Sequence, residues 1–226
     1  MTSSSYGFVE LSGHMADDAS VVNSARVSFA RQIDGLSELS DADKGLINFL
    51  MRERHGTPFE HNSMRFHVKC PVFVAREWFR HRIGSFNEFS ARYSEVPNDF
   101  WVPEIDHVRI QEGKPGAYTF FPMNSELAQD AVETIDGVND RCYATYRYLL
   151  ERGVAKEVAR SVLPVSMYTQ FYWTVNARSL MNFCSLRSAE TAQQEIREYS
   201  KNVEEIFSLL MPITYKAWID NGRVAP

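Results

Sequence analysis

Residues 63–70 read Ser-Met-Arg-Phe-His-Val-Lys-Cys, and this stretch decides the fold class. Its polar residues alternate with the apolar residues Met64, Phe66, Val68 and Cys70. A period of two over eight residues predicts a β-strand with one buried and one polar face. Pro71 follows directly, and residues 72–80 predict a helix with this proline in its first turn.

Segments with helical periodicity lie on both sides of this strand along the chain. Apolar residues recur near one side of these segments, most clearly at every third or fourth position of residues 124–152. The predicted helices are Asp17–Ala30, one capped by Asp41 and ending near Gly56, Asn124–Arg152 with its stop at Gly153, Lys156–Val162, Ala177–Arg187 and Ala189–Leu210. Residues 167–175 are rich in aromatic residues and threonine and predict a second strand.

This order of elements mixes helices and strands without a regular βαβ repeat, which favours an α+β fold. No internal repeat, low-complexity tract or long linker interrupts the sequence. We therefore expect a single mixed domain over residues 1–226, with a small antiparallel sheet flanked by helices.

The composition is close to that of an average soluble globular protein, with 44% hydrophobic and 23% charged residues. No apolar run approaches the roughly 20 residues that span a bilayer, and the Ser-rich amino terminus lacks a secretory pattern. We therefore expect a cytoplasmic protein with no membrane partner. The net charge of −5 disfavours a nucleic acid polymer, because such binding depends on neutralising phosphates.

The spacing of cysteines and histidines indicates neither a disulfide framework nor a metal site. Cys70, Cys142 and Cys184 are far apart and form no C-x-x-C pair, so three reduced thiols are expected. His61 and His67 lie six residues apart on a predicted loop and strand, which is poor spacing for metal ligands. We expect no bound metal.

Residues 80–93 read Arg-His-Arg-Ile-Gly-Ser-Phe-Asn-Glu-Phe-Ser-Ala-Arg-Tyr and concentrate the polar chemistry of the chain. Gly84 and Ser85 disfavour a continued helix, so we expect a loop that leaves a helix end. An arginine guanidinium can donate two hydrogen bonds to phosphate oxygens, and asparagine and glutamate can form hydrogen bonds with a base or a sugar. Composition alone leaves open a solvated loop, a basic patch for nucleic acid, and a site for a nucleoside monophosphate.

The spacing within this segment separates these interpretations. Arg80, His81 and Arg82, followed after seven residues by Ser90, resemble the R-H-R-x7-S signature of the flavin-dependent thymidylate synthase family. The resemblance extends to residues 55–61 (HGTPFEH), 159–164 (ARSVLP) and 176–183 (NARSLMNF), and to residues 186 and 187. Together these blocks cover most of the chain from about residue 55 to residue 200.

The resemblance implies a homotetramer of one mixed domain, with active sites formed where subunits meet. The implied reaction is the reductive methylation of dUMP to dTMP. The implied carbon donor is 5,10-methylenetetrahydrofolate, and reduced FAD, regenerated by NADPH, is the hydride donor. The expected partners are therefore dUMP, folate and further copies of the chain.

The resemblance also implies which residues form the site. The expected flavin-binding residues are Thr57, Arg80, His81, Arg82, Ile83, Asn87, Glu88, Asn176, Arg178, Asn182 and Leu186. The expected dUMP-binding residues are Glu77, Trp78, Phe79, Arg80, Glu88, Phe89, Ser90, Ala91, Arg92, Arg160 and Arg187. The candidate catalytic residues are Arg187, Ser90 and His55.

The chemistry gives these candidates defined roles. Uracil C5 is a poor nucleophile until electron density enters the ring, and Arg187 is expected to stabilise the ionised base in a dry pocket. Ser90 is expected beside the pyrimidine. His55 either lines the flavin or folate entrance or ends a helix, where the dipole favours it.

Helix geometry gives a separate expectation for two arginines. Arg178 and Arg187 are nine residues apart, which is about half a turn out of phase on a straight helix. We expect them to face opposite directions, one towards flavin and one towards nucleotide. The alternative is two surface arginines on an exposed helix.

Two positions depart from the family pattern. Some relatives have histidine where this chain has Thr191, so a flavin contact there is in question. Glu77 stands where others have glutamine, and an ionised carboxylate accepts hydrogen bonds but does not donate them.

Three other functions fit parts of the sequence. A cysteine-dependent thymidylate synthase needs an activated thiol, and we expect none of the three cysteines to have an exposed, electropositive setting. A general flavin reductase would consume NADPH without dUMP. A nucleotide-binding regulatory module would bind dUMP tightly without a flavin.

Overall fold

The computed structural model describes residues 7–29 and 39–226 of the chain. Its backbone contacts divide the chain into two compact units. The first unit comprises Met1–Lys69, Glu77–Asn87 and Phe171–Pro226, and the second comprises Cys70–Arg76 and Glu88–Gln170. The expectation of a single domain over residues 1–226 stays a prediction.

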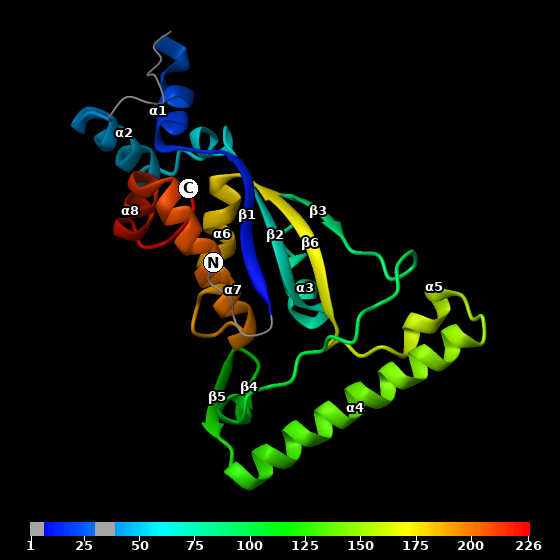
Figure 1. Cartoon of the computed structure of the whole chain (residues 1–226). Coiled ribbons are helices and arrows are strands. Elements are labelled where there is room, and N and C mark those ends of the chain that lie inside the picture. The colour runs from blue at the N-terminus through cyan, green and yellow to red at the C-terminus, as the bar shows by residue number, and fades with distance from the viewer. Residues whose placement is uncertain (1–6, 30–38) are drawn as a thin grey trace. The chain divides into compact units, whose positions relative to one another are not determined.

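A four-stranded sheet has the strand order β1-β2-β6-β3 (Figure 1). Its strands are β1 (Phe8–Met15), β2 (Ser63–Pro71), β6 (Tyr168–Val175) and β3 (Ser85–Glu88). Strand β1 pairs antiparallel with β2, with Phe8 opposite Lys69 and a register shift between Leu11 and Gly13. The predicted α+β fold with a small antiparallel sheet is confirmed.

The alternation in β2 buries one face of the strand, as predicted. The fully buried residues are Met64, Phe66, Val68 and Cys70. Phe66 packs against Trp173 of β6, with ring centroids 5.6 Å apart. Burying each large apolar side chain contributes roughly 1.5–3 kcal/mol, so this face anchors the sheet.

Five helices of the first unit accompany the sheet. They are α1 (Asp18–Arg26), α2 (Asp41–Arg52), α6 (Ala177–Arg187), α7 (Gln194–Leu210) and α8 (Pro212–Asp220). Helix α7 packs on both β1 and α6 (Figure 1). The buried Asp18 fixes α1 to the start of α8, because its carboxylate accepts the backbone N–H groups of Ile213 and Thr214 at 2.9 and 2.8 Å. These are orphan donors of a helix N-terminus.

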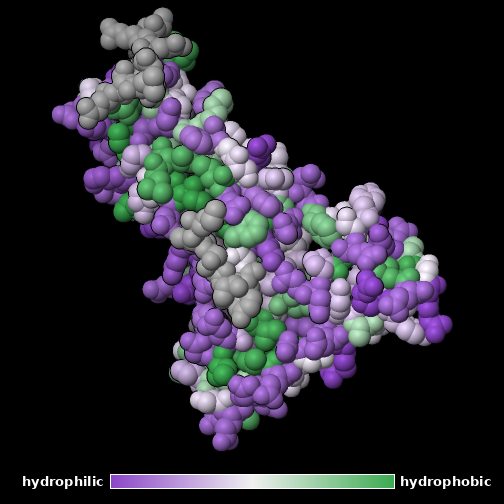
Figure 2. All heavy atoms as spheres, in the orientation of Figure 1, coloured by the Kyte–Doolittle hydropathy of each residue, from purple (hydrophilic) through white to green (hydrophobic). Residues whose placement is uncertain are grey.

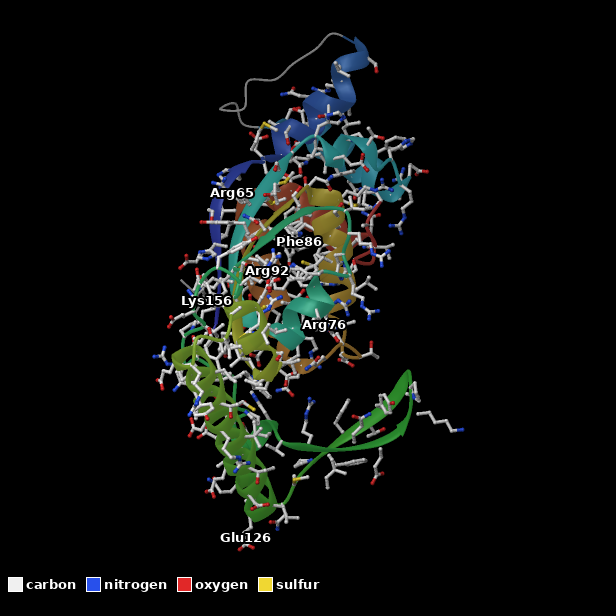
Figure 3. The ribbon with its side chains drawn as sticks, turned by 90° about the vertical axis from the view of Figure 1, so that its right-hand side faces the viewer. Arg65, Arg76, Phe86, Arg92, Glu126 and Lys156 are labelled. Carbon is white, nitrogen blue, oxygen red and sulfur yellow. The ribbon has the colours of Figure 1, made fainter. Side chains whose placement is uncertain are left out.

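An aromatic core lies beneath the arginine-rich segment in the first unit. Helix α3 (Val72–Trp78) ends at Trp78, whose ring centroid lies 4.6 Å from that of Phe183 and 5.3 Å from that of Trp173. Phe86 of β3, marked in Figure 3, stacks on Trp173 at 6.3 Å. The arginine-rich segment that follows Trp78 therefore starts from a residue packed in this aromatic core.

The second unit contains the longest helix, α4 (Ser125–Glu151). Asn124 caps it by accepting the backbone N–H of Glu126, which Figure 3 marks, at 2.9 Å. The other elements that lie wholly within this unit are η3 (Ile105–His107), α5 (Lys156–Ala159), η4 (Arg160–Val162) and a hairpin of β4 (Arg109–Lys114) and β5 (Ala117–Pro122). The small core of this unit is formed by Ala91, Val96, Tyr146 and Ala159.

Many apolar side chains of the second unit remain at its surface. On the predicted apolar stripe of α4, Tyr146 is fully buried, but Leu127 is 61% exposed and Val138 is 38% exposed. Figure 2 shows apolar side chains gathered over the β4–β5 hairpin. The exposed large residues there are Ile110, Tyr118, Phe120 and Phe121.

Several predicted boundaries of the first unit need correction. Ser40, not Asp41, caps α2, because its side chain and that of Asp43 form a reciprocal capping box. The helix ends at Arg52 rather than near Gly56, and the chain turns at Arg54 with φ 62°. A short helix, η2 (Thr57–Glu60), follows.

Other boundaries also differ from the sequence predictions. Pro71 closes β2 and does not lie in the helix, and residues 85–88 form β3 within the predicted loop. Helix α1 is followed by η1 (Val27–Phe29), and predicted residue Ala30 lies outside the described residues. Helix α7 begins at residue 194 rather than 189. The bounds of α6 are confirmed, whereas β1, the β4–β5 hairpin and α8 had not been predicted.

Within the described ranges, no helix combines the length and the apolar character needed to cross a membrane.

Candidate active site

A cavity of about 580 Å³ opens in the first unit. Residues 80–83, Glu60 of η2, one side of α6 and residues 225–226 form its walls. A volume of this size lies in the range of cofactor and substrate pockets.

The cavity is positively charged although the chain carries a net charge of −5. Its lining contains four arginine side chains, Arg80, Arg82, Arg178 and Arg187, against one acidic side chain, Glu60. The guanidinium groups of Arg80 and Arg82 have no hydrogen bond or ion pair within the described residues. These two groups are therefore available to an anionic ligand.

Arg187, in the last turn of α6, joins the R-H-R segment to the end of α3. Its Nε donates to His81 Nε2 at 3.0 Å, and its Nη2 donates to the backbone carbonyl of Glu77 at 3.2 Å. Burial, and secondly the Arg187 charge, lower the pKa of His81 to about 4. His81 is therefore neutral near pH 7 and carries its proton on Nδ1, which leaves Nε2 as the acceptor.

Arg178, in the first turn of α6, is held by two acceptors. Its Nη1 pairs with the carboxylate of Glu60, and its Nε donates to the main-chain oxygen of Pro226 at 2.5 Å. A Cβ atom at Gly56 would lie 2.6 Å from Arg178 Nε. Glycine at this position therefore leaves room for the guanidinium.

Helix α6 is fixed at its N-terminus by two asparagines. Asn176 caps the helix by accepting the backbone N–H of Ser179 at 2.9 Å. The buried Asn62 accepts the backbone N–H of Ala177 at 2.7 Å and donates to the carbonyl of Phe59 at 3.1 Å. Because α6 is tied to η2 in this way, its arginines start from a fixed backbone.

The structure places part of the predicted flavin set together at this cavity. The predicted residues that line it are Arg80, His81, Arg82, Ile83, Arg178, Asn182 and Leu186. Ile83 and Leu186 are 75% and 54% exposed, which gives the opening an apolar rim. Thr57, Asn87 and Asn176 belong to the same unit but not to the lining, and Glu88 belongs to the second unit.

The prediction that Arg178 and Arg187 face opposite directions is wrong, because both line this cavity. The phase of two Cα atoms on a helix does not decide where long arginine side chains end. Arg178 extends towards Glu60 and Arg187 towards Glu77, and both residues line the same cavity.

The predicted nucleotide set is divided between the two units. Arg80, Arg187 and the residues that precede the R-H-R segment, Glu77, Trp78 and Phe79, belong to the first unit, and Trp78 is fully buried among aromatic rings. The predicted nucleotide residues of the second unit are Glu88, Phe89, Ser90, Ala91, Arg92 and Arg160.

In the second unit, residues 88–92 continue from β3 into a tight turn. Glu88 accepts a hydrogen bond from the Thr169 hydroxyl at 2.8 Å. Ser90 begins the turn, since its carbonyl accepts the backbone N–H of Tyr93 at 3.0 Å. Arg92 is exposed and lies over the Tyr93 ring at 5.0 Å, and Ala91 is buried in the core of this unit.

The candidate His55 and the departing position Thr191 are not part of the cavity lining. His55 is exposed beyond the end of α2 and stacks on Phe49, with ring centroids 5.9 Å apart. Thr191 is exposed in the turn before α7. The proposed roles of His55 at the site stay predictions.

The prediction missed some of the lining. The residues missed are Glu60, Ser179, Ala225 and Pro226. Glu60 and Ser179 lie inside the two motif blocks around η2 and α6, so those blocks contained the signal. Ala225 and Pro226 carry no sequence pattern, and only the folded chain brings them to the cavity and Pro226 to Arg178.

The cysteines and acidic groups have ordinary settings. All three cysteines are free, Cys70 and Cys184 are buried, and burial raises the pKa of the Cys70 thiol well above its usual value. A group of potential ligand atoms from Glu104, Asp106 and His107 lies within 4.8 Å. Exposed acidic groups often gather in this way without an ion, so we assign no metal site.

The fold and the cavity define an α+β protein with an arginine-lined cavity and a neutral histidine. The chain belongs to the family described as thymidylate synthase complementing protein, whose model matches residues 10–213. It is 49% identical over 215 residues to the flavin-dependent thymidylate synthase of Thermosipho africanus, covering 94% of this chain and 91% of that protein. The protein of the same name from Tropheryma whipplei strain TW08/27 is 45% identical over 226 residues, with 96% and 94% covered. The predicted family and the prediction of an enzyme are confirmed.

Solved structures agree with this family assignment. A UMP/dUMP methylase, PolB, of Streptomyces cacaoi bound with 5-Br dUMP has a TM-score of 0.88 and 44% identity, covering 97% of each chain. The structure of PolB bound with 5-Br UMP has a TM-score of 0.89 and 42% identity, covering 99% of this chain and 98% of that one.

Proposed function

We propose that this chain methylates dUMP to dTMP reductively. The proposed carbon donor is 5,10-methylenetetrahydrofolate, and the proposed hydride donor is reduced FAD, which NADPH regenerates. The observation that carries the proposal is the arginine-lined cavity at Arg80–Ile83, in a chain of this family. The PolB structure bound with 5-Br dUMP supports dUMP as the nucleotide.

The residues of the cavity fit FAD. Its diphosphate carries two negative charges, and Arg80 and Arg82 offer guanidinium groups without protein partners in the described ranges. Ile83 and Leu186 offer apolar surface to a planar ring system. Gly56 leaves the space into which Arg178 extends. These residues would hold the cofactor, which supplies the hydride when it is bound and reduced.

The remaining chemistry falls to Arg187 and His81. A guanidinium at the uracil edge stabilises negative charge on the ionised base, which increases electron density at C5. The hydrogen bond to neutral His81 and the contact with Glu77 fix the orientation of Arg187 before substrate arrives. We assign Ser90 to the pyrimidine and Arg92 and Arg160 to the nucleotide anion.

We also propose a homotetramer whose active sites combine residues of different subunits. The exposed apolar side chains of α4 and of the β4–β5 hairpin support assembly, since surfaces of this kind mark interaction sites. A cytoplasmic location, as expected from the sequence, is part of the same proposal.

A second substrate follows from the PolB comparison. PolB is described as a UMP/dUMP methylase and has been solved with a UMP analogue. UMP is therefore the second candidate nucleotide for this chain, and it differs from dUMP only by the ribose 2′-hydroxyl.

The test is an omission series with the purified protein. The visible absorbance spectrum reports bound flavin, and dTMP formation is then measured with dUMP, 5,10-methylenetetrahydrofolate, FAD and NADPH. In reactions with flavin-free protein, no dTMP should form when any one of these four components is omitted. NADPH consumption at an unchanged rate without dUMP and without product would identify a flavin reductase instead. UMP in place of dUMP tests the second substrate.

A further inference from the structure

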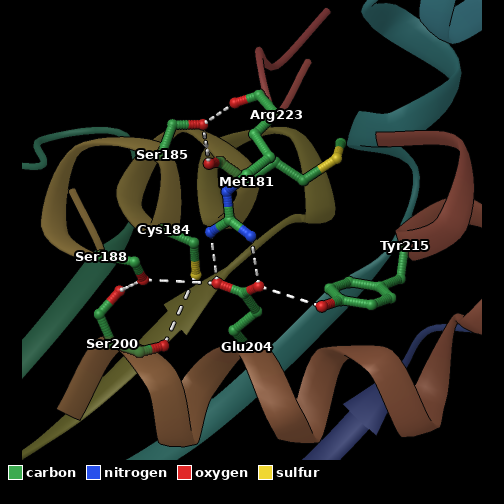
Figure 4. Close-up of polar contacts among 8 residues, drawn as sticks. All are labelled: Met181, Cys184, Ser185, Ser188, Ser200, Glu204, Tyr215 and Arg223. Atoms are coloured by element: carbon green, nitrogen blue, oxygen red, sulfur yellow. Dashed lines mark hydrogen bonds and ion pairs between the residues drawn. The ribbon is translucent and has the colours of Figure 1, made fainter. Parts of the chain in front are cut away.

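A second cavity of the first unit, of about 830 Å³, contains an ion pair in its wall (Figure 4). Glu204 of α7, whose side chain is 12% exposed, accepts both Nη groups of Arg223 at 2.7 Å. Two parallel hydrogen bonds between guanidinium and carboxylate are stronger and more directional than a simple surface pair.

Further contacts hold the same ion pair from neighbouring helices. The Tyr215 hydroxyl donates to Glu204 Oε1 at 3.1 Å, and the Ser188 hydroxyl donates to Oε2 at 3.4 Å. The Arg223 guanidinium lies over the Trp218 ring at 4.5 Å. Glu204 is therefore the common acceptor for groups that follow α6, belong to α8 and come after α8.

The backbone of Arg223 is held in an unusual conformation. Its φ of 57° lies in the left-handed region, which is strained for a residue other than glycine. Its carbonyl accepts the Ser185 hydroxyl at 2.5 Å, and its N–H donates to the Trp218 carbonyl at 2.9 Å. The ion pair with Glu204 keeps the chain in this turn.

Residues 223–226 connect this ion pair to the first cavity. Arg54 donates to the Val224 carbonyl at 2.6 Å, and Ala225 and Pro226 line the first cavity. The main-chain oxygen of Pro226 accepts the Nε–H of Arg178 at 2.5 Å. With Nε and Nη1 occupied, Arg178 Nη2 keeps both its N–H donors without a hydrogen bond in the described part of the chain.

We propose that Glu204 and Arg223 are positioning residues for the cofactor site. They fix residues 223–226, and the main-chain oxygen of Pro226 in turn orients Arg178 so that Nη2 is presented to an anionic group of the cofactor. This inference rests on the proposed function, because it takes the first cavity as the flavin site. Pre-organising a guanidinium in this way strengthens binding by reducing the conformational entropy lost when the ligand arrives.

The test is a double-mutant cycle read by FAD affinity. Titration of flavin-free protein with FAD, followed by flavin fluorescence, gives Kd for each variant at fixed ionic strength. Glu204→Gln should raise Kd by about tenfold, as expected for the loss of one well-placed charge-assisted hydrogen bond at Arg178. Deletion of residues 225 and 226 leaves the ion pair intact and should raise Kd to a similar extent.

The cycle separates positioning from general stabilisation. In an Arg178→Gln background, Glu204→Gln should have no further effect on Kd, because Arg178 is the group through which it acts. The matched control is Asp220→Asn, which removes the exposed pair between Lys216 and Asp220 at 2.6 Å on α8 and should leave Kd unchanged. Circular dichroism and thermal unfolding confirm that each variant is folded.

Three outcomes of the cycle would overturn the inference. They are an unchanged Kd in a folded Glu204→Gln variant, a full effect of Glu204→Gln in the Arg178→Gln background, and tighter FAD binding after the deletion. The last would mean that residues 225 and 226 obstruct the cavity rather than orient Arg178.

A second readout needs no flavin and separates this inference from the proposed function. The Nε–H signal of Arg178, assigned by its loss in Arg178→Gln, should be protected from solvent exchange in the wild-type protein. Protection should be lost in Glu204→Gln and in the deletion variant, and equal protection in all of them would overturn the inference. Failure of the wild type to bind FAD would instead count against the flavin site.

Discussion

At the scale of single residues, Arg187 and His81 form the most specific feature of the cavity. The histidine accepts from the arginine at 3.0 Å, and this arrangement requires an unprotonated ring nitrogen. Burial and the arginine charge both oppose protonation of His81. The hydrogen bond should therefore be lost when His81 is protonated at acidic pH.

We predict that His81 makes the folded protein less stable at acidic pH. Its pKa falls from an ordinary value of 6.5 to about 4 on folding, so between these values the unfolded chain binds more protons. The free energy of unfolding should therefore rise with pH through this range, and the contribution should be complete above pH 6.5. Urea unfolding of flavin-free protein at several pH values measures this slope.

His81→Gln provides the control for this prediction. Glutamine keeps an oxygen acceptor for Arg187 but does not titrate, so the variant should show a shallower rise between pH 4.5 and 6.5 (roughly the interval between the two pKa values). Carboxylates contribute equally to both proteins. Identical slopes would show that His81 is not responsible.

Gly56 gives a prediction about space rather than charge. In Gly56→Ala the new Cβ would lie 2.6 Å from Arg178 Nε, so the arginine must move. FAD Kd should rise several-fold, on the order of the effect of one displaced charge-assisted hydrogen bond. The matched control is Gly45→Ala, because a Cβ there meets no atom within 4 Å. That control should leave Kd unchanged and stabilise α2 by about 0.5–1 kcal/mol. Equal Kd values in both variants would contradict the prediction.

Some site residues could be predicted from the sequence and others could not. The segment from Arg80 to Ile83 was found because its motif spacing is rare, and all four residues line the cavity. Pro226 is 48 residues from Arg178 and acts through a main-chain oxygen, which every residue possesses. No property of its side chain could have pointed to this contact.

At the scale of elements, the strands illustrate the same difference. Strand β2 was predicted from its alternation, because one face of the strand is buried and the other is more exposed along most of its length. Strand β3 has four residues, and only Phe86 among them is packed into the core, so periodicity has too little length to be detected. The β4–β5 hairpin had no buried face to mark it, because its residues are exposed along almost their whole length.

The link between η2 and α6 gives a prediction about stability. Asn62 is buried and bonds both elements, so Asn62→Ala leaves the N–H of Ala177 and the carbonyl of Phe59 unsatisfied. The free energy of unfolding should fall by about 2 kcal/mol. Urea unfolding measures this loss, and a change within about 0.5 kcal/mol would contradict the role given to Asn62. The control is Asn48→Ala, because Asn48 accepts its hydrogen bond from Asn221 at the surface.

At the scale of the whole molecule, the surface apolar residues predict assembly. Leu127 and Val138 belong to the apolar stripe of α4, yet both side chains are exposed in the single chain. Light scattering after size exclusion should give a mass four times that of the chain at micromolar concentration. A monomer under these conditions would contradict the proposed tetramer.

The central claim concerns the whole enzyme, and tritium release from C5-labelled dUMP tests it most directly. The account predicts release that requires FAD, NADPH and 5,10-methylenetetrahydrofolate. It also predicts a loss of about 100-fold or more in Arg187→Ala, the scale of removing one electrostatic donor at a reacting centre. A protein that stays colourless and releases no tritium even with added FAD would contradict the account. It would favour a nucleotide-binding module without catalysis.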